Sequence, residues 1–138
     1  MARQTVRITR DSEKSVEKMF AYLSDHNNLS KVFLIPVKRI KDGQDDVNGV
    51  GSVRKLGIGP VGVEETVVAV EPNKSIDYRI TRGGGPIQNH KGNISFEKKG
   101  SGSRVTWTIE FDSPVPMAGS VIKMILGQGV EQGLKRVA

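Results

Sequence analysis

Apolar and polar residues alternate over several short segments of this chain, and this pattern predicts strands that are half buried in a sheet. The alternation is clearest from Val105 to Phe111, where every second residue is apolar and the residues between are Thr106, Thr108 and Glu110. A strand of this kind belongs in an antiparallel sheet with one face on the core. The segments predicted to be strands are 5–9, 37–41, 51–58, 63–70, 75–81, 87–97 and 105–111.

A long amphipathic helix is predicted from Ser113 to Ala138. Ser113 is a suitable N-cap, and the prolines that follow it fit a first helical turn. Gly129 and Gly133 interrupt the apolar stripe, which indicates either one wall of a cavity or close packing against the sheet. The apolar residues of the stripe are Ala118, Val121, Ile122, Ile125, Leu126, Val130, Leu134 and Val137.

Shorter helices are expected between the first two strands. Ser12 or Ser15 can cap a helix whose stripe runs from Val16 to Leu23, and residues 28–35 are either a second short helix or a loop. The order is therefore one strand, one or two short helices, six strands and a long helix. Because the strands are joined by local turns, the sheet is expected to be antiparallel, with its inner face on the last helix. This is an α+β single domain over residues 1–138.

Composition excludes several classes of protein. The chain has no cysteine, and its two histidines lie in different predicted elements, so we expect no metal site and no cofactor. The net charge of +6 is spread along the chain with few aromatic residues, which argues against specific nucleic-acid binding. No segment is apolar enough to span a bilayer, and the N-terminus lacks the pattern of a signal peptide, so a cytoplasmic location is the default.

Familiar motifs are absent or out of place. Gly57, Gly59 and Gly62 match the letters of a dinucleotide-binding fingerprint, but Pro60 and a β-rich segment follow where that motif needs a helix. We interpret this segment as a loop between two strands that could close over a pocket. No Gly-x-Ser-x-Gly elbow supports a hydrolase.

Polar residues on the inward faces of the strands are the remaining candidates for function. Arg54, Tyr78 and His90 share the parity of apolar neighbours on their strands. His90 is either a structural histidine or a pocket acid or base. Glu64 and Glu65 are adjacent, so one of them points inward unless a bulge leaves both in solvent.

The order of elements resembles the helix-grip, START-like fold of the SRPBCC superfamily, in which a seven-stranded antiparallel sheet wraps around a long C-terminal helix. The local marks are residues 16–25 (VEKMFAYLSD), 49–54 (GVGSVR), 70–72 (VEP) before Tyr78, and 103–107 (SRVTW). They are most similar to the polyketide cyclase/dehydrase-like branch. Many relatives carry Trp-x-x-Pro after the first helices, whereas this chain has Phe33 three residues before Pro36.

This resemblance implies an apolar cavity between the sheet and the last helix. By similarity to plant hormone receptors of this fold, two loops would close the cavity as a gate and a latch, at Gly59 and Pro60 and at Gly84 and Pro86. The latch's hydrogen-bonding residues are missing here, so signalling through a partner is not implied. The expected ligand-binding residues are Phe33, Leu56, Ile58, Glu64, Tyr78, Ile80, His90, Trp107, Ile122, Leu126 and Val130.

Three functional hypotheses follow. The first is a binding protein for a small hydrophobic molecule such as a lipid or polyketide, as a monomer or homodimer. The second is a cyclase or dehydratase in which His90 or Glu64 removes a proton and Tyr78 or Arg54 stabilises the enolate. The third is a protein-partner module of the same fold.

Overall fold

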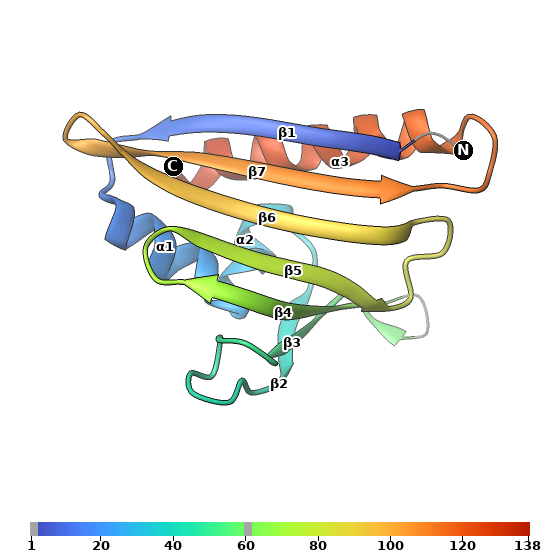
Figure 1. Cartoon of the computed structure of the whole chain (residues 1–138), viewed down its shortest axis with the longest axis horizontal. Helices are drawn as coiled ribbons and strands as arrows, with labels where there is room; N and C mark the ends of the chain where they lie inside the picture. Colours follow the sequence, from blue (N-terminus) through green and yellow to red (C-terminus); the bar gives the residue numbers. More distant parts are fainter. Residues whose placement is uncertain (1–2, 60–61) are drawn as a thin grey trace.

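Seven antiparallel strands form one sheet in the order β1-β7-β6-β5-β4-β3-β2 (Figure 1). The computed structural model describes residues 3–59 and 62–138. The strands are β1 (Arg3–Ser12), β2 (Val37–Lys41), β3 (Val53–Leu56), β4 (Val63–Glu71), β5 (Ser75–Arg82), β6 (Gln88–Lys99) and β7 (Gly102–Asp112). All seven predicted strands are confirmed, although β1 is longer than expected and β3 is shorter.

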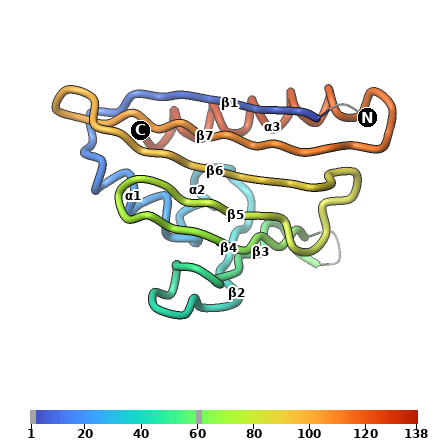
Figure 2. Tube along the Cα trace, in the orientation of Figure 1, coloured from blue at the N-terminus to red at the C-terminus, as the bar shows by residue number. Residues whose placement is uncertain are grey.

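The sheet is strongly curved. Figure 2 shows β1, β7 and β6 along the top of the molecule and β4, β3 and β2 below them. Strand β1 closes the upper edge by pairing with β7, from Arg3 opposite Asp112 to Ser12 opposite Ser103. Register shifts in β4, between Glu64 and Glu65 and again between Val67 and Ala69, mark β-bulges of the kind that bend a strand. The concave face of the sheet thereby encloses the core.

Short helices connect β1 to β2, as the sequence predicts. They are α1 (Val16–Ser24), the 3₁₀ turn η1 (His26–Asn28) and α2 (Leu29–Phe33). The Ser15 side chain accepts a hydrogen bond from the Lys18 amide at 3.2 Å, which makes Ser15 the N-cap of α1. Residues 28–35 are thus helical as far as Phe33, and Leu34 ends α2 in the left-handed conformation at φ 56°.

The long helix α3 (Ala118–Val137) runs alongside β1 and contacts α2. It begins later than predicted, because Met117 precedes it in the left-handed conformation at φ 66° and no side chain caps it. Ser113 is therefore not the cap, and its buried hydroxyl has no partner among the residues described. The C-terminal end is tied down instead, since Lys14 Nζ donates to the Val137 carbonyl at 2.7 Å and Ser12 Oγ to the Ala138 carbonyl at 3.1 Å.

The predicted apolar stripe of α3 is buried only in part. Val130, Leu134 and Val137 lie in the core, whereas Val121 and Ile125 are exposed. Within the described part of the chain, no helix has the length and apolar character needed to cross a membrane.

The two glycines in the stripe have different surroundings. A Cβ atom on Gly133 would lie 2.5 Å from Val32 Cγ1 and 2.8 Å from the Val32 carbonyl oxygen, so Gly133 allows α3 to pack closely against α2. A Cβ atom on Gly129 would meet nothing within 4 Å. Of the two alternatives for the glycines in the stripe, close packing therefore applies to Gly133, and open space applies to Gly129.

A Gly133→Ala substitution should lower the free energy of unfolding by about 1–3 kcal/mol, because α2 must shift to admit the methyl group. The matched change Gly127→Ala should raise that free energy by about 0.5–1 kcal/mol, since its Cβ would lie 3.7 Å from Val6 and alanine favours the helix. Urea unfolding of both variants checks this. Equal effects of the two substitutions would contradict close packing at Gly133.

Candidate functional site

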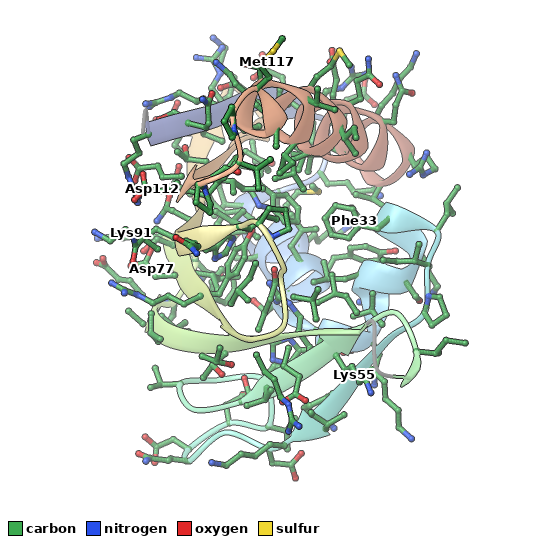
Figure 3. The ribbon with its side chains drawn as sticks, turned by 90° about the vertical axis from the view of Figure 1, so that its right-hand side faces the viewer. Phe33, Lys55, Asp77, Lys91, Asp112 and Met117 are labelled. Carbon is green, nitrogen blue, oxygen red and sulfur yellow. The ribbon has the colours of Figure 1, made fainter. Side chains whose placement is uncertain are left out.

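An apolar cavity of about 270 Å³ lies between the concave face of the sheet, α2 and α3. Figure 3 shows Phe33 in this interior, below α3, while Asp77 and Lys91 lie on the opposite, convex side of the sheet. A larger hollow of about 560 Å³ is a more open groove between the start of α1, the turn after β4 and the hairpin that joins β6 to β7. The cavity is lined by Phe33, Ile35, Leu56, Glu65, Tyr78, Ile80, Ile87, His90, Trp107, Ile109, Ile125, Leu126, Gly129 and Val130.

Most of the residues expected to bind a ligand do line this cavity. Three do not: Ile58 is 71% exposed, Ile122 packs against the core beside the cavity, and Glu64 lies on the other face of the sheet. The residues on the cavity wall that the sequence analysis expected are Phe33, Leu56, Tyr78, Ile80, His90, Trp107, Leu126 and Val130.

Glu65, not Glu64, is the carboxylate of the cavity wall. On β4, Glu65 is paired with Arg54 of β3 and Ile80 of β5, which both face inward, whereas Glu64 is opposite Lys55 and Arg82. Alternation along residues 63–70 does not decide between the two, because Glu65 shares its parity with Val63 and Val67 while Glu64 shares its parity with Val68 and Val70. Glu64, which the resemblance placed on the wall, does not line the cavity, because the register of β4 with β3 and β5 gives that place to Glu65.

Arg54 does not line the cavity but lies directly behind its wall. Its side chain is 2% exposed, its Nε donates to Glu65 Oε1 at 2.8 Å, and its Nη2 lies 2.8 Å from the same oxygen in an ion pair. The guanidinium carbon lies 4.5 Å from the centre of the Tyr78 ring. An ion pair and a cation–π contact therefore hold the charge of Arg54 in place.

Arg54 also determines the protonation of His26. Arg54 Nη1 lies 3.2 Å from His26 Nδ1, and because a guanidinium only donates, Nδ1 is the acceptor. The ring proton is therefore on Nε2 and is donated to Ser52 Oγ at 2.7 Å, and Ser52 in turn donates to the Gly49 carbonyl. Burial, and then the charges of Arg54 and Arg39, lower the pKa of His26 to about 3.

Tyr78 crosses one strand to reach Trp107. Tyr78 is paired with Gly92 on β6, and a Cβ atom on Gly92 would overlap the tyrosine ring, so only glycine leaves room for it. The hydroxyl of Tyr78 accepts a hydrogen bond from Trp107 Nε1 at 2.6 Å. Burial raises the pKa of Tyr78, which keeps the phenol protonated. Phe33 meets the Trp107 ring edge-on, with 5.6 Å between the ring centres.

His90 is the second polar group on the wall after Glu65. Its Nδ1 atom accepts a hydrogen bond from the Ile80 amide at 3.0 Å, so the neutral ring carries its proton on Nε2. Burial lowers the pKa of His90, and the charge of Glu65 opposes this effect. His90 is thus a structural histidine at one nitrogen and a hydrogen-bond donor at the other.

Of the two loops expected to close the cavity, the structure describes the second in full and the first without Pro60 and Val61. Gly59 precedes Pro60, which lies outside the described residues. In the second loop, Ile87 lines the cavity, and its amide donates to the Gly84 carbonyl at 3.0 Å. Pro86 is exposed beside it. Loop 83–87 therefore lies at the cavity, while its movement stays a prediction.

The sequence analysis did not predict several residues of the cavity wall, nor the buried position of His26. Ile109 could have been found, because it shares the inward face of Trp107. Ile35 and Ile125 are exposed at the cavity and carried no such signal, since their position depends on how α2 and α3 are packed. Within residues 3–59 and 62–138, no group of three potential metal-ligating side chains occurs.

The low pKa of His26 predicts a loss of stability in acid. The unfolded chain binds a proton at this ring near pH 6.5 and the folded chain near pH 3, so the unfolded state is favoured as the pH falls between these values. The expected slope is about 1.4 kcal/mol per pH unit. Urea unfolding of the wild type and His26→Gln from pH 7 to pH 4 measures it. Identical slopes in the two proteins would contradict a neutral buried His26.

Comparisons with solved structures agree with this architecture. The crystal structure of Ara h 8.0201 is 18% identical, with a TM-score of 0.70 over 97% of this chain and 96% of that chain. A protein from Nitrosospira multiformis is 18% identical, with a TM-score of 0.73 over 96% of both chains. TTHA0849 from Thermus thermophilus is 16% identical, with a TM-score of 0.74 over 97% of this chain and 94% of that chain. At these identities the likeness concerns the fold.

A search of curated proteins found no relative of this chain. The sequence profile of the family described as "Polyketide cyclase / dehydrase and lipid transport" matches residues 3–138. Because that match spans nearly the whole chain, the protein belongs to this family, which is of the SRPBCC type and has the helix-grip, START-like fold.

Proposed function

We propose that this protein binds a small hydrophobic molecule in the cavity between the sheet and α3. The observation that carries the proposal is the open space beside Gly129, in the middle of a helix whose other glycines meet neighbouring groups. Protein interiors are close-packed, and a void lined by Ile, Leu, Val and aromatic side chains forfeits their contacts with a filling group. A ligand in the cavity would restore those contacts.

The mouth of the cavity supports the same proposal. Ile35 and Ile125 line the cavity, yet their side chains are 42% and 60% exposed. Ligand pockets are mostly apolar with a few placed polar groups, and the wall here has that composition. The description of the family includes lipid transport, which is consistent with an apolar ligand.

A Gly129→Leu substitution should abolish ligand binding while raising the free energy of unfolding of the empty protein. Leucine would fill the open space, and it favours a helix over glycine by about 1 kcal/mol. Thermal shift against a library of lipids and aromatic polyketides measures binding in the wild type and in Gly129→Leu. Gly127→Ala, which changes helix propensity away from the cavity, serves as the control and should keep binding. Ligand-induced stabilisation that persists in Gly129→Leu would contradict the cavity as the binding site.

Cyclase or dehydratase catalysis in the same cavity is the second candidate. It is favoured by the presence of both a carboxylate and an imidazole on an otherwise apolar wall. The roles differ from those first expected, because His90 carries its proton on Nε2 and is suited to donate it, which leaves Glu65 as the base. Turnover of a polyketide substrate that is unchanged in Glu65→Gln would contradict this candidate.

A further inference from the structure

We infer that the cavity selects a neutral ligand with a hydroxyl group, and that Glu65 determines this specificity by accepting a hydrogen bond from that hydroxyl. This inference rests on the proposed function and names the chemical class of its ligand. It separates apolar alcohols and phenols from fatty acids, which have similar apolar bodies but a carboxylate at the polar end.

The two carboxylate oxygens of Glu65 have different surroundings. Arg54 Nε donates to Oε1 and Arg54 Nη2 lies 2.8 Å from the same oxygen in the ion pair, whereas no described residue donates to Oε2. Among the described side chains, Ser113 Oγ is the one polar atom that is both buried and without a partner. Because Glu65 Oε2 also has no donor and is not such an atom, it is not fully buried, and Glu65 lines the cavity. Oε2 is an available acceptor on an apolar wall.

The positive charge that balances Glu65 is directed away from a ligand. Arg54 is not part of the cavity wall, its Nη1 atom donates to His26, and its face lies against the Tyr78 ring. A ligand in the cavity thus meets the carboxylate of this pair and not the guanidinium. An anionic ligand would place like charges close together where little water can screen them.

His90 and Tyr78 provide the complementary donors. His90 Nε2 carries the ring proton, and the Tyr78 hydroxyl, which accepts from Trp107, retains its own proton to donate. The His90 and Tyr78 rings are adjacent, with 5.5 Å between their centres, and both line the cavity. A hydroxyl group both donates and accepts, so it can satisfy Glu65 and one of these donors. An ether only accepts, and a carboxylate accepts and repels Glu65.

Trp107 makes the selectivity measurable, because it is the one tryptophan of the chain and lies on the cavity wall. We would titrate the wild type at pH 7 with 1-decanol, decyl methyl ether and decanoate, and follow Trp107 fluorescence. A hydrogen bond to a charged acceptor should make decanol bind at least about 10-fold more tightly than the ether. Decanoate should bind more weakly than decanol.

Glu65→Gln should change the relative affinities for the three probes, which a purely structural role of Glu65 would leave unchanged. Arg54 only donates, so the amide oxygen of the glutamine must face Arg54 and its NH₂ group must face the cavity. The preference for decanol over the ether should then fall to about 1, and decanoate should gain about 10-fold in affinity. Glu64→Gln is the matched control, because it neutralises the neighbouring carboxylate on the outer face, and it should leave all ratios unchanged.

The outcomes separate this inference from the proposed function. Binding of all three probes by the wild type without preference, or a preference for decanoate, overturns the hydroxyl specificity and leaves hydrophobic ligand binding in place. The same shift in Glu64→Gln as in Glu65→Gln also overturns it. Failure of all three probes to bind also overturns the hydroxyl specificity, whereas only the absence of stabilisation by every member of the thermal-shift library contradicts hydrophobic ligand binding. If Glu65→Gln does not fold, as judged by circular dichroism, the ratio between alcohol and ether in the wild type decides alone.

Discussion

The buried charge of Arg54 is the constraint on which the interior of this protein depends. A charged group that is withdrawn from water needs partners, and removing one of them is strongly destabilising. Glu65 neutralises Arg54, His26 accepts from it, and Tyr78 covers its face. These partners come from β4, η1 and β5, so a single side chain joins the lower part of the sheet to the helical connection. The wall of the cavity is built on the near side of this cluster.

Three glycines shape the space next to that wall, because the absence of a Cβ atom has a different effect at each of them. Gly92 gives the Tyr78 ring a path across β6, which lets its hydroxyl reach Trp107. Gly133 brings α3 against α2, and thereby positions Phe33 at the end of α2 below the long helix. Gly129 leaves space that no neighbour fills. Two of the glycines allow contacts, and the third keeps a cavity open.

Sequence reasoning succeeded where the information was local and periodic. The strands, the short helices and the long helix follow from alternation and helical spacing, and most of the cavity wall follows from strand parity, as for Tyr78 and Trp107. It failed where position depends on packing between elements. Ile125 lies in the apolar stripe of α3, but only the placement of the helix decides that it stands at the cavity mouth. The start of α3 was misplaced because Met117 adopts a left-handed conformation that the prolines before it do not signal.

The two ends of α3 are held very differently, and this has a consequence for access to the interior. At the C-terminal end, Lys14 and Ser12 bind the last carbonyl groups, while the N-terminal end has no side-chain cap and follows the exposed Met117. Local opening of a structure requires less free energy where fewer hydrogen bonds and buried contacts must be broken. We therefore expect local opening to begin at the N-terminal end of α3, nearer to Ile125 at the cavity mouth, and to reach the buried contacts of Val130, Leu134 and Val137 last.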